Sequence, residues 1–258
     1  TTSAEYDRLL MCTGSNPFML PIPGKDLKGV IAYRDIADTQ AMIDAATHYK
    51  HAVVIGGGLL GLEAANGLML RGMSVSVVHV MPTLMDRQLD NVAGALLQKS
   101  LTERGLSFLM GAQTEALLSP ADFGRWAAER AAQVKEEPAQ RAGDTEQNAK
   151  PPRGPVDSVA AGPQAGVNIV PDLQAKLASS PYRVCAVRFK DGSVVPADLV
   201  VMAVGIRPNT ELAQAMRLHC DKGIVVNDTL QTITDARIYS VGECAAHRGT
   251  AYGLVAPL

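Results

Sequence analysis

The sequence predicts an α/β fold in which helices pack against a parallel sheet. Two apolar runs with several β-branched residues, at 52–55 and 197–204, have the composition of strands buried on both faces. Residues 50–80 read as strand, glycine turn, helix and strand, which is a βαβ unit. Helix patterns at 34–49 and 90–104 flank this unit, so helices and strands alternate as in a parallel sheet.

The first strand of the unit ends in glycines with the spacing G-x-G-x-x-G. In this pattern the first glycine permits a tight turn, the second admits a pyrophosphate and the third lets helix and strand pack closely. The helix that follows, 59–71, offers free N–H groups and a positive dipole end to phosphates. The alternative is a turn that only permits tight packing, but both strands and the helix lie where the motif requires them. We therefore expect a Rossmann-like dinucleotide site formed by Gly56, Gly57, Gly58, Leu59, Leu60 and Gly61.

The second strand of the unit, 74–79, ends at His79, where an Asp or Glu usually binds the ribose 2′-hydroxyl. A neutral imidazole can hydrogen-bond a ribose, whereas a protonated one favours a 2′-phosphate. This position therefore leaves NADH and NADPH open.

The residues before the unit form a strand at 6–12, a turn at 13–17 and a short strand within 24–33. The helix of 34–49 has apolar residues at helical spacing. We expect its inner face to contain Ile36, Ala41, Met42 and Ala45. Arg34, at the start of this helix, is either a charge at a helix end or a ligand contact.

The residues after the unit begin with a good N-cap, Asp90, for a helix that ends near Arg104. We expect its buried side chains to be Val92, Leu96, Leu97 and Leu101. Short strands at 106–110 and 114–118 follow.

The segment 119–181 differs in kind from its surroundings. Ser119 and Pro120 predict the start of a helix that runs from 121 to about 136 and carries Trp126. Residues 138–166 are rich in Pro, Gly, Ala and charge, and therefore predict a flexible linker. A short helix follows at 172–179. We interpret 119–181 as an insertion, part of it flexible.

The last third of the chain predicts a hairpin at 182–195, the buried strand 197–204 and a helix from Thr210 to 217. A short strand at 223–227 precedes a last strand, 236–241, which ends in Gly242-Glu243.

Composition excludes several classes of function. The chain has 258 residues, 47% of them hydrophobic and 19% charged, with a net charge of −2. This balance gives no basic footprint for nucleic acid, and no apolar run is long enough to span a membrane. The four cysteines form no C-x-x-C, and neither they nor the five histidines show metal-ligand spacing. We expect free thiols, a cytoplasmic protein, no metal site and no catalytic side chain.

Four motifs in one order resemble the pyridine nucleotide-disulfide oxidoreductase family. They are LLMCTGSNP at 9–17, the glycine turn at 56–61, LVVMAVGIRPN at 199–209 and TDARIYSVGEC at 234–244. The resemblance implies two dinucleotides, NAD(P)H and FAD. It implies that FAD lies beside Thr13 and Gly14 and along Gly242 and Glu243, and that Gly205 lies near the bound nicotinamide cofactor.

Within that family the nitrite reductase branch is similar in two segments, RDIADTQAM at 34–42 and VVHVMPTLMDRQLD at 77–90. This similarity implies that NADH is the donor and that Glu63 orients the nicotinamide, although a plain helix acid is the alternative. It also implies an iron–sulfur cluster and a sirohaem downstream of this chain, and a first βαβ unit upstream. The implied partners are the rest of the polypeptide and a small reductase subunit.

These inferences predict an NAD(P)H-binding domain, a parallel sheet with helices and a β-meander, inserted into a partial FAD-binding domain. We assign 1–33 and 212–258 to the FAD part, and 34–118 and 182–211 to the NAD(P)H part. The expected function is electron entry, from NADH to FAD, in an assimilatory nitrite reductase. The alternatives are a stand-alone rubredoxin or ferredoxin reductase, and a nucleotide-binding fragment without activity.

Overall fold

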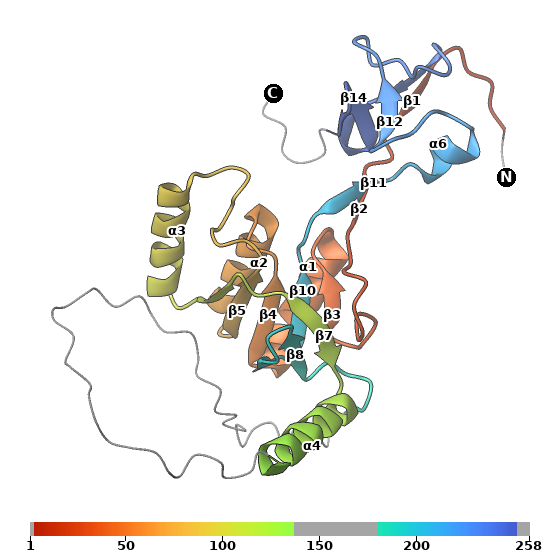
Figure 1. Ribbon diagram of the computed structural model, residues 1–258. Coiled ribbons are helices and arrows are strands. Elements are labelled where there is room, and N and C mark those ends of the chain that lie inside the picture. Colours follow the sequence, from red (N-terminus) through yellow and green to blue (C-terminus); the bar gives the residue numbers. More distant parts are fainter. Residues whose placement is uncertain (1–2, 137–179, 252–258) are drawn as a thin grey trace.

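The computed structural model describes residues 3–136 and 180–251 (Figure 1). These residues form a larger lobe around a five-stranded parallel sheet and a smaller lobe near the chain ends. The linker predicted at 138–166 and the helix predicted at 172–179 lie outside the described residues. No helix in the described part is long and apolar enough to cross a membrane.

The parallel sheet confirms the predicted fold class. Its strand order is β3-β10-β4-β5-β6. The bounds are Val30–Ala32 for β3, Leu199–Met202 for β10, His51–Ile55 for β4, Ser74–His79 for β5 and Ser107–Met110 for β6. Ile55 pairs with Met202 and with Val78, so the carboxyl ends of β10, β4 and β5 lie side by side. Ligands of open α/β sheets bind outside such carboxyl ends.

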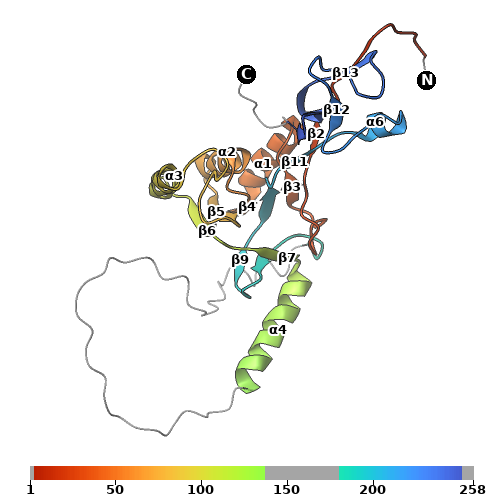
Figure 2. The same ribbon diagram turned by 45° about the horizontal axis from the view of Figure 1, so that its top comes forward.

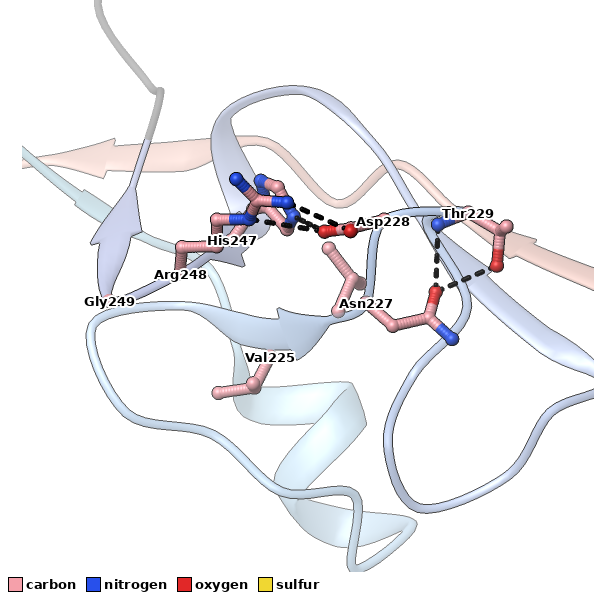
Figure 3. Close-up of a pocket in the computed structure, with 8 residues that line it drawn as sticks. Val225, Asn227, Asp228, Thr229, His247, Arg248 and Gly249 are labelled. Atoms are coloured by element: carbon pink, nitrogen blue, oxygen red, sulfur yellow. Dashed lines mark hydrogen bonds and ion pairs between the residues drawn. The ribbon is translucent and has the colours of Figure 1, made fainter.

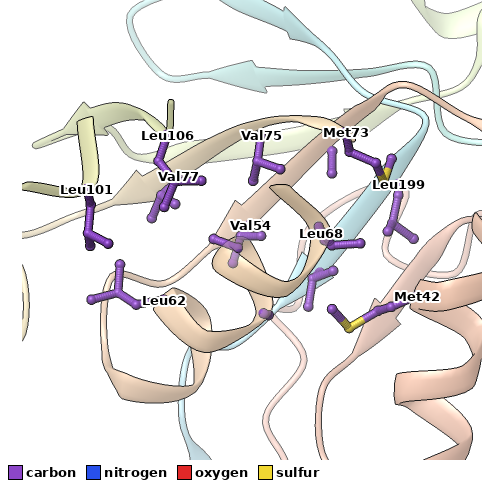
Figure 4. Packing of buried hydrophobic residues seen from close by; sticks show 14 of the residues in the cluster. Met42, Val54, Leu62, Leu68, Met73, Val75, Val77, Leu101, Leu106 and Leu199 are labelled. Atoms are coloured by element: carbon purple, nitrogen blue, oxygen red, sulfur yellow. The ribbon is translucent and has the colours of Figure 1, made fainter. Parts of the chain in front are cut away.

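Three helices cover one face of the sheet. They are α1 (Ile36–His48), α2 (Leu59–Leu70) and α3 (Asn91–Glu103). Figure 4 shows the core between them and the sheet, in which Leu68 of α2 lies among Val54, Val75 and Leu199. Every second residue of a strand points to this face, and the residues between them point to the other. Both faces are thus apolar, as in a sheet that is buried on both sides.

An antiparallel meander covers the other face. Its strands are β7 (Thr114–Leu118), β8 (Ala186–Phe189) and β9 (Val194–Pro196). Val53 and Val200 of the parallel sheet share a core cluster with Leu117 and Phe189 of the meander. Helix α4 (Pro120–Glu136) packs on the meander through Phe123, at the end of the larger lobe away from the smaller lobe (Figure 2). The predicted β-meander is therefore confirmed.

The smaller lobe contains β1 (Leu9–Met11), β12 (Ile224–Val226), β13 (Ile238–Ser240), β14 (Ala245–His247), β15 (Thr250–Ala251), the short helix α6 (Glu211–Ala215) and the 3-10 turn η1 (Gly242–Cys244). Met11, Ile224 and Ile238 belong to its own core. Two strands connect the lobes. They are β2 (Ser15–Pro17) and β11 (Ile206–Pro208), which pair antiparallel.

Several local predictions were wrong. Residues 15–17 form strand β2, where we expected only a turn, and β14 and β15 follow the strand that we expected to be last. Strands of two or three residues show no periodicity, and only their distant partners define them. The side chain of Thr210 makes no capping hydrogen bond to α6.

The inner faces of two helices were also partly wrong. Ile36 and Ala41 of α1 are exposed, as are Val92 and Leu96 of α3. Gly94 sets the inner face of α3, because a Cβ there would lie 3.0 Å from the backbone oxygen of Leu84. At about 100° per residue, Val92 and Leu96 lie roughly 160° from Gly94 and face away.

Candidate functional site

The glycine turn at the end of β4 has two glycines that the fold itself requires. Gly56 has φ +121°, and a Cβ there would lie 2.2 Å from the backbone oxygen of Ala203. A Cβ on Gly61 would lie 1.9 Å from the backbone oxygen of Gly56. Gly58 differs, because a Cβ there would meet nothing within 4 Å. The space above Gly58 is therefore open to a ligand.

The N-terminus of α2 lies directly above this turn. Its N-cap is Gly58, which has no side chain to cap the helix. Leu62 is the first residue whose N–H bonds back to the N-cap carbonyl, at 3.0 Å. The amides of Leu59, Leu60 and Gly61 therefore have no partner within the helix. Free amides, a positive dipole end and open space above Gly58 fit a pyrophosphate.

His79 lies beneath the turn. Its Nδ1 accepts the N–H of Gly57 at 3.2 Å, and its Nε2 lies 3.1 Å from Oδ1 of Asp86. The acceptor role of Nδ1 places the proton on Nε2, which then donates to Asp86. The side chain is only 11% exposed. Both ring nitrogens thus have partners within the protein.

Thr13 and Gly14 lie at one end of the paired connecting strands β2 and β11, and Gly205 lies at the other end. Thr13 Oγ1 donates to the backbone oxygen of Asn209 at 2.6 Å, and Asn209 N–H donates to the oxygen of Gly14 at 2.8 Å. The oxygen of Gly205 accepts the N–H of Phe18 at 2.9 Å. A Cβ on Gly56 would lie 3.4 Å from the nitrogen of Val204, so the glycine turn adjoins the start of this crossing.

Arg34 and Glu243 form an ion pair between the lobes. Two guanidinium nitrogens of Arg34 face the two carboxylate oxygens of Glu243, and the Nη1–Oε1 distance is 3.2 Å. Ser15 Oγ donates to the same carboxylate at 2.6 Å. Burial alone would raise the pKa of Glu243, but the hydrogen bonds from Arg34 and Ser15 outweigh it and hold the pKa below its ordinary value. The carboxylate is therefore ionised at neutral pH.

Open space adjoins three glycines of the predicted site, of which Gly14 and Gly242 are expected beside FAD and Gly205 near the nicotinamide cofactor. Gly14, Gly205 and Gly242 have φ of +67°, +114° and +76°, and a Cβ on any of them would meet nothing within 4 Å. Positive φ favours glycine at each position. Gly242 directly precedes Glu243, and Gly14 directly precedes Ser15, which bonds to the Glu243 carboxylate. Bare backbone at these two positions fits a cofactor that approaches the main chain closely.

Other predicted and unpredicted residues complete the site. Glu63 is exposed on the first turns of α2, and no side-chain hydrogen bond or ion pair of Glu63 occurs among the described residues. Ser15 and Asp86 were not predicted as site residues. Both residues lie in segments that resemble the family, Ser15 in 9–17 and Asp86 in 77–90, but neither was assigned a role there. Among the described residues, no group of His, Cys, Asp or Glu is placed to hold a metal ion.

A shallow hollow of about 520 Å³ lies in the smaller lobe between β12 and β14 (Figure 3). Asp228 forms one side of it and accepts hydrogen bonds from Arg248 at 2.8 Å and His247 at 2.7 Å. The bonds from Arg248, and then His247, lower the pKa of Asp228. The hollow contains none of the predicted site residues, so it is distinct from the glycine turn.

Comparison with curated proteins gives relatives along nearly the whole chain. The chain is 46% identical over 253 residues to a nitrite reductase [NAD(P)H] of Bacillus subtilis. The aligned region covers 98% of this chain and 24% of that protein. The chain is 40% identical over 254 residues to the assimilatory nitrate reductase electron transfer subunit of the same organism, covering 98% of this chain and 25% of that protein. The chain thus spans about a quarter of the length of these relatives.

Solved structures share the fold. A ferredoxin reductase from Rhodopseudomonas palustris superposes with a TM-score of 0.69 at 24% identity, over 98% of this chain and 47% of that chain. A water-forming NADH oxidase from Lactobacillus brevis superposes with a TM-score of 0.64 at 19% identity, over 95% of this chain and 40% of that chain. At these identities the likeness establishes the fold.

The family profile for pyridine nucleotide-disulphide oxidoreductases matches residues 1–138 and 161–255. The unmatched stretch, 139–160, lies within the insertion expected at 119–181. The resemblance that the four motifs indicated is confirmed, and with it an NAD(P)H-dependent flavoprotein type of oxidoreductase. The chain belongs to the pyridine nucleotide-disulphide oxidoreductase family, whose members bind FAD and NAD(P)H.

Proposed function

We propose that this chain is the electron-entry part of an assimilatory nitrite reductase large subunit, with NADH as donor and FAD as acceptor. The observation that carries the proposal is the position of the glycine turn next to the crossing between the lobes. Gly56 lies against Ala203, and Gly205 begins the crossing. At the far end of the crossing Ser15 pairs with Pro208 and bonds to Glu243 of the ion pair. Relatives that are named nitrite reductase support nitrite reduction, with a nicotinamide dinucleotide as donor, over the other candidate functions.

The residues have separate tasks in this proposal. The free amides at the N-terminus of α2 bind the pyrophosphate of the nicotinamide dinucleotide, and the bare backbone at Gly14 and Gly242 admits FAD. The Arg34–Glu243 pair holds the lobes together. When bound, the dinucleotide supplies a hydride and the flavin accepts it, so the protein contributes position and electrostatics.

We assign the smaller lobe to the FAD-binding part and the larger lobe to the NAD(P)H-binding part. Strand β3 falls within 1–33, which we expected in the FAD part, yet it pairs with β10 of the parallel sheet. This pairing supports a boundary at β2 and β11 instead. The packing of Phe123 against the meander supports a place for α4 inside the NAD(P)H part.

The wider assembly follows from the same proposal. The electron acceptors are an iron–sulfur cluster and a sirohaem carried outside these residues, and the partners are the rest of the polypeptide and a small reductase subunit. The cysteines at positions 12, 185, 220 and 244 form no disulfide among the described residues, which supports a reducing compartment, the cytoplasm.

A second candidate is a stand-alone reductase of ferredoxin or rubredoxin. The likeness to a ferredoxin reductase over 98% of this chain favours it. A third candidate is a fragment that binds a nucleotide without turning over. All three candidate functions use the glycine turn, so nucleotide binding alone cannot distinguish them. They differ in flavin content and in electron acceptor.

The test is anaerobic mixing of the FAD-supplemented chain with NADH or NADPH, followed by the visible absorbance of the flavin. We expect NADH to bleach the flavin and NADPH to do so more slowly. The complete gene product is then given nitrite, ferredoxin or rubredoxin as acceptor. Consumption of nitrite supports the proposal, whereas reduction of ferredoxin or rubredoxin alone supports the second candidate. Nucleotide binding without bleaching supports the third.

A further inference from the structure

We propose that Asp86 supplies the carboxylate that binds the 2′-hydroxyl of the adenosine ribose and disfavours a 2′-phosphate, so that Asp86 determines the preference for NADH. This inference rests on the proposed use of a nicotinamide dinucleotide at the glycine turn. In the dinucleotide fingerprint an acid about 20 residues past the turn holds this hydroxyl. The fingerprint position here holds His79, which has no carboxylate.

His79 is already committed to the protein. Its Nδ1 accepts the N–H of Gly57 and its Nε2 faces Asp86. A Cβ on Gly57 would lie 2.8 Å from Cγ of the ring, so the imidazole packs directly against the turn. His79 therefore shapes the turn and holds Asp86, and its ring has no free nitrogen for a ribose.

The main chain around Asp86 is fixed at the end of β5. The side chain of Leu84 is fully buried in the helix-side core, and Met85 N–H donates to the oxygen of Gly57 at 3.0 Å. These contacts place the segment 84–86 against the glycine turn. The Asp86 carboxylate lies 3.1 Å from the ring that occupies the fingerprint position. The Asp86 carboxylate is therefore hydrogen-bonded to the side chain at the position where the dinucleotide fingerprint has its acid.

The carboxylate has an oxygen to spare. Oδ1 faces His79, whereas Oδ2 has no hydrogen-bond partner among the described residues, and the side chain is 30% exposed. A ribose 2′-hydroxyl can donate to Oδ2 as a charge-assisted hydrogen bond. A 2′-phosphate would bring like charges together. Arg87, the next residue, is exposed and has the opposite charge, so the test must separate the two side chains.

The experiment is a calorimetric titration of the full chain with NADH and with NADPH. Asp86→Asn keeps an oxygen for His79 and removes the charge. We expect the Kd for NADH to rise about tenfold and the Kd for NADPH to stay or fall. Glu103→Gln removes an exposed acid at the end of α3 and is the matched control, with both Kd values unchanged. Arg87→Gln should leave the Kd for NADH within about twofold of the wild type.

Three outcomes would overturn the inference while leaving the proposed function intact. They are an unchanged NADH-to-NADPH ratio in Asp86→Asn, an equal loss for both nucleotides, and a larger change in the ratio for Arg87→Gln than for Asp86→Asn. An equal loss would mean that Asp86 acts only by holding His79 and the turn. Failure of the wild-type chain to bind either nucleotide would overturn the proposed function as well. An unchanged thermal midpoint of Asp86→Asn shows that the variant is folded.

Discussion

Arg34 and Glu243, 209 positions apart, join the two lobes through paired contacts between guanidinium and carboxylate. Arg34 directly precedes Asp35, the N-cap of α1, and Glu243 lies in the turn after β13. Ser15, on a connecting strand, donates to the same carboxylate. One carboxylate thus ties the larger lobe, the smaller lobe and the crossing between them.

Removal of the guanidinium in Arg34→Ala should destabilise the chain by about 1 kcal/mol, because a bidentate, partly buried pair is worth more than an exposed one. Urea unfolding at pH 7 measures the difference. Arg8→Ala is the control, since Arg8 is exposed and bonds only to the backbone oxygen of its neighbour Asp7. Equal unfolding midpoints for the two variants would show that the pair does not stabilise the fold.

The same pair should make stability depend on pH. Hydrogen bonds to Glu243 hold its pKa in the folded chain below the ordinary value of 4.5, despite burial, which acts in the opposite direction. The unfolded chain then binds the proton first as the pH falls, so the stabilisation is present above 4.5 and is lost as the pH drops through the lowered pKa. The stability gap between the wild type and Arg34→Ala should therefore narrow in that acid range. A gap that is constant down to pH 3 would contradict this linkage.

Two glycines of the same turn should respond to substitution in opposite ways. Gly58→Val places a side chain in open space at an ordinary φ of −86°, so the thermal midpoint should hold while the Kd for NADH rises at least about tenfold. Gly56→Ala forces a Cβ to 2.2 Å from the oxygen of Ala203 at φ +121° and should unfold the turn. Thermal melts with NADH titrations distinguish the two. Unchanged NADH affinity in a folded Gly58→Val variant would rule out a dinucleotide site at this turn.

The βαβ unit was predictable because its signals are local. Strand β5 has the predicted bounds, Ser74–His79, and α2 starts at the predicted residue, Leu59. The glycine spacing also carries its own physical reason, since two of these positions tolerate no Cβ. In this unit, where a few neighbouring residues determine the backbone, pattern and structure agree.

Long-range pairs were not predictable from local patterns. The connecting strands β2 and β11 contain three residues each and end in Pro17 and Pro208, so they resemble loops until they pair. The same holds for the contact of Arg34 with Glu243. Glu243 was expected beside FAD, Arg34 was left open between a helix-end charge and a ligand contact, and neither was expected to contact the other. His79 was expected at the ribose. Its ring instead hydrogen-bonds to the N–H of Gly57 and to the carboxylate of Asp86, two contacts that the local pattern does not show.

The four cysteines should differ in reactivity. Cys12 is exposed, whereas Cys185 and Cys244 are buried. Cys220 is partly exposed, and burial raises the pKa of its thiol, which lowers the fraction of reactive thiolate. Iodoacetamide at neutral pH should therefore modify Cys12 first, and all four only after unfolding. Mass spectrometry of peptides from a time course checks the order, and early modification of Cys244 would contradict the packing of the smaller lobe.

Helix α4 should be part of the folded domain rather than a detachable insertion. Phe123 is 6% exposed and packs with Ala116, Leu118 and Ala186 of the meander. Phe123→Ala should therefore lower the free energy of unfolding by about 3 kcal/mol. Glu129→Ala, an exposed position on the same helix, should change it by less than about 0.5 kcal/mol. If α4 were loosely attached, the two variants would unfold at the same urea concentration, because the helix would melt separately from the sheet.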